Sequence, residues 1–211
     1  MASSMIHLAI TKGLTEERET KALERLFLGS ILPDGAVSGN SHLKKCLTDN
    51  DFTYDLEFFR TRFAEQMQKD PLYLGYYLHL VQDLFFRNFI YGEYHFDSSI
   101  PGNVEKLHHD YAVLNGYVAA TNGLKAEMLP VQEISREPLL ELATFDVPGL
   151  VREVWKQFVP PKEEPAFVFT KEMAEAFITR SKKLCQQELE DILQGKTGIN
   201  SAAYAWKRPG R

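Results

Sequence analysis

The sequence predicts an all-α protein that folds as a single-domain helical bundle. Several long stretches carry apolar residues at helical spacing, and no segment shows a sustained alternation of apolar and polar residues. The chain has 211 residues, of which 44% are hydrophobic, and this is enough for one domain with a sizeable core. We therefore expect one helical domain over residues 1–195, followed by a polar and mobile tail over residues 196–211.

The first quarter of the chain predicts two short helices and two loops. One helix is expected from Ser4 to about residue 14, with Ser4 able to cap it, and a second apolar run over residues 23–28 ends at Gly29. Residues 29–35 read Gly-Ser-Ile-Leu-Pro-Asp-Gly and are rich in turn-forming residues. Residues 36–52 are mixed and polar, which predicts a surface loop.

The middle of the chain predicts the central helix of the bundle. Residues 55–69 have helical spacing, and their apolar face consists of Leu56, Phe59, Phe63 and Met67. Asp70 and Pro71 are typical of a helix start, as the cap and the first helical residue. The helix that follows is apolar nearly all round, so we expect it to be buried and to end at Gly92.

Three further helices are predicted in the second half. Asn103 can cap a helix that carries Leu107, Tyr111, Leu114 and Val118 on its apolar face. A second helix is expected over residues 146–158, and a proline-rich linker follows over residues 160–165. Residues 170–194 predict a long amphipathic helix, capped by Thr170 and closed by Gly195.

Charge and cysteine content argue against several classes of protein. The net charge of −5, without a long run of lysine or arginine, argues against binding of nucleic acid through its phosphates. Cys46 and Cys185 lie far apart and fit no CxxC pattern, which argues against a disulfide framework or a thiolate zinc site. The first residues lack the basic and apolar regions of a secretory signal, so we expect a cytoplasmic protein.

The apolar stretch over residues 72–91 resembles a membrane span in length but not in content. Its polar and charged residues are His79, Gln82, Asp83, Arg87 and Asn88. Such groups are costly at mid-depth in a bilayer. We therefore predict no transmembrane segment, and instead a helix buried in the protein whose polar groups serve a site.

His79 and Asp83 provide the strongest chemical pattern. Residues four apart lie on one face of a helix, so this imidazole and this carboxylate can hold the same metal ion. Neither group is stable in an apolar environment unless it is paired or bound to a metal. A hydrogen bond between the two in the core is the alternative interpretation.

Three other residues are candidates that are ambiguous when taken singly. Asp34 follows a proline in a glycine-flanked turn, which can aim a carboxylate inward but is also an ordinary place for an aspartate. His42 follows eight residues later and is as compatible with the surface as with a metal. His7 lies on a short apolar helix, where a histidine often serves packing alone.

Taken together and in order, these residues resemble a known family. A histidine near the amino terminus is followed by Gly-x3-Pro-Asp, by a second histidine, and by Leu-Gly-x3-His-x3-Asp. This order resembles the zinc-dependent phospholipase C family, within the superfamily that includes zinc-dependent single-strand nucleases. The matched positions span roughly residues 5–90 and are Gly29, Pro33, Asp34, His42, Leu74, Gly75, His79 and Asp83.

The resemblance implies a helical fold around a buried zinc cluster. Asp34, His42, His79 and Asp83 would form the first zinc site, and this mixture of imidazoles and carboxylates suits zinc. Asp83 would also bridge to a second ion, which His7 would help to hold. The expected cofactor is therefore one or two zinc ions, or another divalent metal.

The chain departs from the family after Asp83. Where the family has a further histidine this chain has Phe89, and no histidine here is followed by glutamate four residues on. His108 and His109 can supply a substitute ligand, and we favour His109 because Asp110 and Tyr111 border it. A solvent-facing histidine pair is the alternative, and His95 in a predicted loop is a weaker candidate.

The expected function is the metal-dependent hydrolysis of phosphate esters, with a small phosphate ester or a phospholipid head group as substrate. A bound metal lowers the pKa of a water molecule and polarises the phosphoryl oxygen. Asp83 or Asp110 would act as the catalytic base. One rival is an HD-type phosphohydrolase, which would use His79, His109, Asp110 and Asp146. The other is a non-catalytic helical protein with a structural or regulatory metal.

Overall fold

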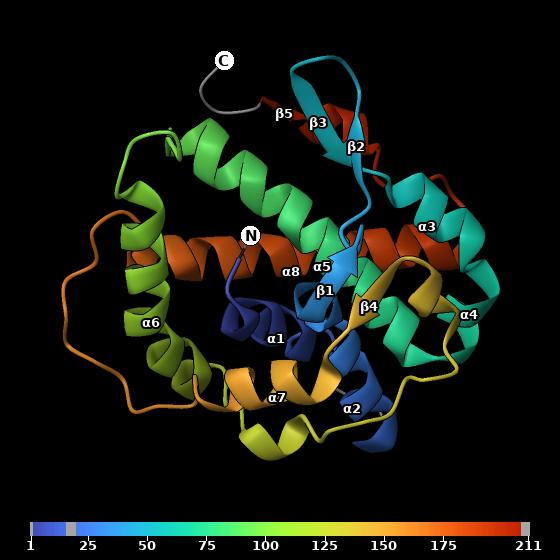
Figure 1. The fold of residues 1–211 in the computed structure, drawn as a ribbon, viewed down its shortest axis with the longest axis horizontal. Coiled ribbons are helices and arrows are strands. Elements are labelled where there is room, and N and C mark those ends of the chain that lie inside the picture. Colours follow the sequence, from blue (N-terminus) through green and yellow to red (C-terminus); the bar gives the residue numbers. More distant parts are fainter. Residues whose placement is uncertain (1, 16–19, 208–211) are drawn as a thin grey trace.

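The computed structural model describes residues 2–15 and 20–207, and it confirms a mostly helical fold (Figure 1). The described part contains eight α-helices. They are α1 (Ser4–Lys12), α2 (Thr20–Gly29), α3 (Leu56–Arg62), α4 (Ala64–Lys69), α5 (Pro71–Arg87), α6 (Asn103–Thr121), α7 (Val147–Trp155) and α8 (Lys171–Leu193). None of the described helices is long and apolar enough to span a membrane.

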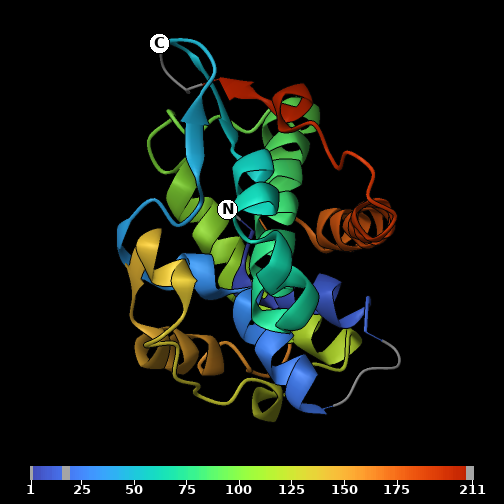
Figure 2. The same cartoon turned by 90° about the vertical axis from the view of Figure 1, so that its right-hand side faces the viewer.

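Helix α5 is the centre of the fold, as its sequence predicts. Of its 17 residues, 14 are buried. The Asp70 side chain accepts a hydrogen bond from the Leu72 amide (2.9 Å) and so caps the helix. Figure 2 shows α5 running through the middle of the molecule, with α8 seen end-on beside it. After Arg87 the chain continues as one turn of π-helix over Asn88–Glu93, a form often found at functional sites.

Two glycines let α2 and α5 cross in close contact. A Cβ atom on Gly29 would lie 2.1 Å from the Leu72 carbonyl oxygen, and one on Gly75 would lie 2.1 Å from the Leu26 carbonyl oxygen. Only glycine permits this approach of the two backbones. The crossing brings the end of α2, and the 3-10 turn Leu32–Gly35 that follows, against the middle of α5.

The all-α prediction is wrong in one respect, because the structure also contains two small sheets. The antiparallel pair β1 (Ala36–Gly39) and β4 (Ala143–Phe145) forms one, and β2 (Lys44–Cys46), β3 (Asp51–Tyr54) and β5 (Trp206–Lys207) form the other in the order β2-β3-β5. Each strand is only two to four residues long. Such strands are too short to show alternation in the sequence, and two of the three pairings join distant segments.

Several boundaries also differ from the sequence-based expectation. Helix α5 ends at Arg87 and not at Gly92, and Ser4 and Asn103 lie inside their helices and do not cap them.

Two further differences change the fold. The single helix expected over residues 55–69 is two helices, which meet at the buried Phe63 with φ −118° and ψ 24°. The segment from residue 196 was expected to be a mobile tail, but it forms a 3-10 turn (Ser201–Tyr204) and strand β5. Trp206 is buried against Tyr54, which explains why this polar segment packs. Residues 208–211 lie outside the described part.

Candidate metal centre

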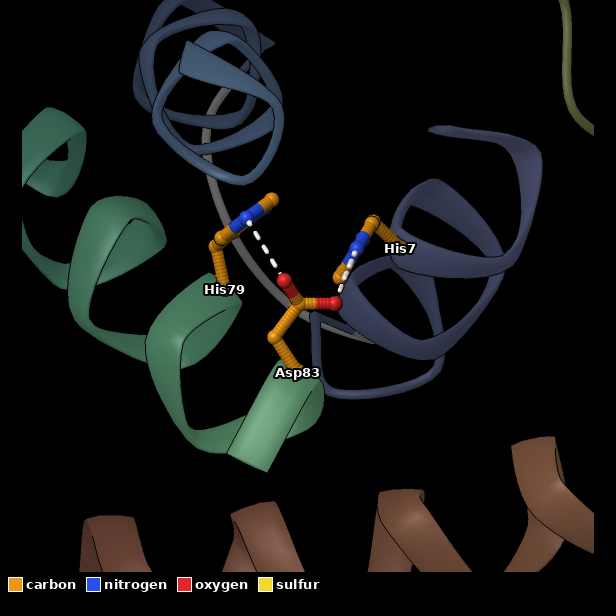
Figure 3. A group of neighbouring side chains, drawn as sticks. All are labelled: His7, His79 and Asp83. Atoms are coloured by element: carbon orange, nitrogen blue, oxygen red, sulfur yellow. Dashed lines mark ion pairs between the residues drawn. The ribbon is translucent and has the colours of Figure 1, made fainter. Parts of the chain in front are cut away.

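Five of the predicted ligands come together in the interior. They come from four segments: α1, the 3-10 turn after α2, the β1–β2 connection and α5. The residues are His7, Asp34, His42, His79 and Asp83, and they form two overlapping groups that could each hold an ion. Figure 3 shows Asp83 between His7 and His79, with one carboxylate oxygen directed at each ring.

Four of these side chains bring ligand atoms close enough together to share one ion. His42 Nε2 lies 3.1 Å from His79 Nε2, 3.4 Å from Asp34 Oδ1 and 3.5 Å from Asp83 Oδ2. His79 Nε2 lies 3.9 Å from Asp34 Oδ1 and 3.7 Å from Asp83 Oδ2. Bonds of about 2.0–2.1 Å to a tetrahedral zinc ion imply ligand separations of about 3.3–3.4 Å. These five separations bracket that value.

Asp83 faces both groups at once. Its Oδ2 atom belongs to the four-ligand set, whereas its Oδ1 atom lies 3.4 Å from His7 Nε2. Oδ1 also accepts a hydrogen bond from the Ala2 amide (3.0 Å), which fixes the carboxylate in place. A carboxylate in this position can bridge two ions.

Each ring presents one nitrogen to the cluster while the other is held from outside. His79 Nδ1 donates to the Ser30 carbonyl oxygen (2.9 Å), and His7 Nδ1 lies 2.8 Å from Gln82 Oε1. His42 Nδ1 lies 3.1 Å from the Ser41 hydroxyl. A carbonyl oxygen can only accept, so His79 Nδ1 carries the proton and its Nε2 presents a lone pair. Outer partners of this kind orient metal-binding histidines.

Of the three outer partners, only Gln82 was predicted, as one of the polar groups of the central helix that serve a site. A glutamine inside an apolar helix, as at position 82, indicates a group that serves a site. Ser30 acts through its backbone carbonyl, which no side-chain pattern can reveal. The Gly29–Gly75 crossing places this carbonyl against His79.

Buried polar atoms without partners are the clearest sign that the cluster fits a cation. His7 Nε2, Asp34 Oδ1 and Asp83 Oδ2 are all buried and lack a hydrogen bond among the residues described. Leaving such atoms unsatisfied is costly, and the great majority of buried polar atoms have a partner. Divalent ions bound in the two groups would satisfy these atoms, so the residues fit the metal that the sequence resemblance implies.

The electrostatics favour the ligand forms of His79, Asp83 and Asp34, whereas for His7 the interactions with Asp83 outweigh burial and raise the pKa. Burial and the neighbouring His7 lower the pKa of His79 to about 3, so its ring is neutral at pH 7. Burial raises the pKa of Asp83, but its interactions with His7 and His79 outweigh this and hold the pKa well below the ordinary value. The pKa of Asp34 is lowered in the same way, because His79 and His42 outweigh burial. Metal ligands must be neutral imidazoles and ionised carboxylates.

Asp110 was predicted as a catalytic base, and the structure contradicts this. Its carboxylate accepts three backbone hydrogen bonds, from the amides of Phe167 (2.9 Å), Val168 (2.7 Å) and Phe169 (2.8 Å). Asp110 therefore anchors the segment before α8 to helix α6. A fully buried carboxylate with three such bonds is not available to take a proton from water.

His109 was predicted as a ligand of the second metal and is not brought to the cluster. Its ring lies between Asp110, Glu164 and Phe167, with Nδ1 3.3 Å from Asp110 Oδ1 and Nε2 3.7 Å from Glu164 Oε2. His109 is only partly buried at the edge of the inward-facing side of α6, whereas the neighbouring Asp110 is fully buried. His108 and His95 are exposed and stand in neither ligand group.

The structure also places the residue at the position of the missing family histidine, and the residues of the HD-type alternative other than His79, outside the cluster. The position of the missing family histidine, Phe89, is filled by aromatic packing against Tyr94 and Phe177, with ring centroids 4.8 and 5.2 Å away. Asp146 caps α7 through the Gly149 amide (2.9 Å). The four residues needed for an HD-type site are thus not assembled in the described part of the chain. Comparison of the chain with protein-family models, with curated proteins and with solved structures found no match.

Proposed function

We propose that this protein is a zinc-dependent hydrolase of phosphate esters, with the metal bound by His7, Asp34, His42, His79 and Asp83. The observation that carries the proposal is the set of five Nε2 and carboxylate-oxygen separations of 3.1–3.9 Å in the four-ligand group. Two imidazoles and two carboxylates suit zinc, and the absence of thiolates disfavours softer metals.

The second position supports catalysis over a purely structural metal. A four-ligand site is closed, as structural zinc sites are. The described residues offer at most three ligands to the second group, from His7, His79 and Asp83, so a tetrahedral zinc ion there would keep one position for water. Zinc bound in this way lowers the pKa of a coordinated water and polarises a phosphoryl oxygen.

Asp34 is the carboxylate best placed to take a proton from the attacking water. Both oxygens of Asp83 face imidazoles, and Asp110 is occupied by backbone amides. Asp34 directs Oδ1 at His42 and His79, and no hydrogen bond to its Oδ2 is made by any side chain or amide in residues 2–15 and 20–207. Its side chain is 17% exposed, unlike that of Asp83. We assign it the role of base.

The substrate class follows from the chemistry of the site and from the resemblance of residues 5–90 to zinc-dependent phospholipases C. We propose a small phosphate ester or a phospholipid head group. A cytoplasmic location stays a prediction from the sequence.

The test is hydrolysis of p-nitrophenyl phosphate and bis(p-nitrophenyl) phosphate by the zinc-loaded chain, measured together with zinc content. The wild type should hydrolyse at least one ester, His79→Ala should lose zinc and activity, and Asp34→Asn should lose most activity while the protein stays folded. His108→Ala is the matched control, because this histidine is exposed and outside the cluster. Full zinc occupancy without hydrolysis of either ester would replace the proposal with the structural-metal alternative.

A further inference from the structure

Arg87 lies one helical turn beyond Asp83 on helix α5. His79, Asp83 and Arg87 are spaced four residues apart, so they share one face of the helix, with Cβ atoms of successive members about 5–6 Å apart. Arg87 is half-buried, and its Nε donates to the Tyr54 hydroxyl (2.8 Å). The Tyr54 ring lies 5.9 Å from the ring of His42, so a single aromatic ring connects Arg87 to the metal ligands.

Aromatic rings hold the guanidinium in a fixed place. Its central carbon lies 4.5 Å from the centroid of the Trp206 ring and 5.8 Å from that of Tyr54. Trp206 in turn packs edge-on against Tyr54 at 4.9 Å. The carboxyl-terminal strand β5 therefore forms part of the wall beside the metal centre.

The charge of Arg87 has no ionic partner in the described part of the chain. Its one hydrogen bond there uses Nε, which leaves the two terminal amino groups of the fork without a partner. By contrast, Arg25, Arg60, Arg62 and Arg180 all pair with glutamate or aspartate. Because the Tyr54 hydroxyl accepts the Nε bond, it keeps its own proton to donate.

Counting charges indicates what the guanidinium can bind. The two aspartates of the cluster balance only one divalent ion, a second ion would add further positive charge, and the histidines are neutral as ligands. Arg87 then remains as an uncompensated positive charge beside the metal. An anion in contact with both would complete the balance, and an arginine fork suits the oxygens of a phosphoryl group.

We propose that Arg87, held by Tyr54 and Trp206 one turn beyond Asp83, is the anion-binding residue of this centre and binds a nonbridging oxygen of the substrate phosphoryl group. This inference rests on the proposed function, since it names the part of the substrate that the site recognises. Tyr54 acts as a positioning residue, and its hydroxyl proton is available to a second oxygen of the same group.

The test is binding of inorganic phosphate to the zinc-loaded full chain, measured by calorimetry beside zinc content and ester hydrolysis. Arg87→Gln should keep its zinc but bind phosphate about 10- to 100-fold more weakly, the range expected for loss of charge-assisted hydrogen bonds. Arg87→Lys should fall between the two, because it keeps the charge but not the fork. In hydrolysis the loss should appear mainly in KM.

Arg180→Gln is the matched control. Arg180 also lies over two aromatic rings, Phe85 and Phe89, each 5.4 Å from its guanidinium carbon, but it is paired with Glu93 (2.6 and 2.7 Å). This variant should bind phosphate as the wild type does. Tyr54→Phe removes one hydroxyl and tests the same site should Arg87→Gln not fold, and it should weaken phosphate binding several-fold.

The outcomes separate this inference from the proposed function. Phosphate binding that depends on Arg87 without ester hydrolysis would support the inference and contradict the hydrolase. Ester hydrolysis by the wild type, with phosphate affinity unchanged in both Arg87→Gln and Tyr54→Phe, would support the hydrolase and overturn the inference. Loss of zinc from Arg87→Gln would also overturn the inference, because Arg87 would then support the metal site and not the anion.

Discussion

Replacing Asp110 with alanine distinguishes its structural role from a catalytic one. The carboxylate accepts three amide hydrogen bonds from residues 167–169 and so joins α6 to the segment that leads into α8. We expect Asp110→Ala to destabilise the fold while leaving the zinc content unchanged. A catalytic base would give the opposite pattern, with normal stability and lost turnover.

The size of the effect follows from the burial of the three donors. A hydrogen bond to a charged group contributes about 1.5–3 kcal/mol. Phe167 is 60% exposed, so its amide can return to water, whereas Phe169 is fully buried and its amide would stay unsatisfied. We therefore expect a loss of about 2–4 kcal/mol in the free energy of unfolding. For a chain of this length that corresponds to a fall in Tm of roughly 5–15 °C.

The assay is denaturant unfolding followed by circular dichroism, with zinc measured on the same samples. Asp97→Ala is the control, because Asp97 also accepts a backbone hydrogen bond, from Ser99 (2.8 Å), but lies in an exposed loop. It should cost about 1 kcal/mol or less. Wild-type stability in Asp110→Ala would refute the anchoring role, and loss of ester hydrolysis without destabilisation would restore Asp110 as a catalytic residue.

Three further variants test the helix crossing, the cap of α5 and the correction at His109. Gly75→Ala should lower the free energy of unfolding by about 1–3 kcal/mol or more and weaken zinc binding, because its Cβ would meet the α2 backbone at 2.1 Å and move the carbonyl that holds His79. The control Gly92→Ala, whose Cβ meets nothing closer than 3.7 Å, should change neither stability nor zinc binding. Equal melting curves for Gly75→Ala and the wild type would contradict the close crossing. Burial raises the pKa of Asp70, but the hydrogen bonds from Arg25 and from the Leu72 amide outweigh burial and leave the pKa below its ordinary value of 3.8. The ionised carboxylate therefore stabilises the fold at pH 7, and this stabilisation is lost as the pH falls below 3.8. Asp70→Asn should therefore cost about 1 kcal/mol in urea unfolding at pH 7 and progressively less toward pH 3, and a deficit independent of pH would argue against this. His109→Ala should keep the wild-type zinc content, and loss of one ion would make His109 a ligand after all.

The sequence predicted which side chains come together in the candidate metal centre where they lie in local motifs. His79 and Asp83 are one helical turn apart, and Asp34 lies in a proline-containing turn, so their placement depends on nearby residues. The helix starts at Asp70 and Thr170 were predicted for the same reason, and both side chains accept the expected capping bond. Local chemistry was sufficient for these features.

The errors that concern the site and the sheets arose where the partner lies far along the chain. Asp110 and His109 are neighbours on α6, and their roles depend on residues 164–169, which the periodicity of α6 does not contain. Strand β1 pairs with β4, and β3 pairs with β5, in each case more than 100 residues later in the chain. Arg87 was noted only as a polar residue in an apolar helix, because its aromatic partner Trp206 is in the segment that the sequence predicts as a mobile tail.

X-ray absorption at the zinc edge tests the central claim most directly, because it reports the ligands of the bound ion. For the zinc-loaded chain we predict only nitrogen and oxygen ligands at about 2.0–2.1 Å, with the outer-shell scattering of imidazole rings. His79→Ala should lose the four-ligand site, whereas His108→Ala should give the wild-type spectrum. Sulfur at about 2.3 Å, or a zinc ion without imidazole ligands, would contradict the proposed centre.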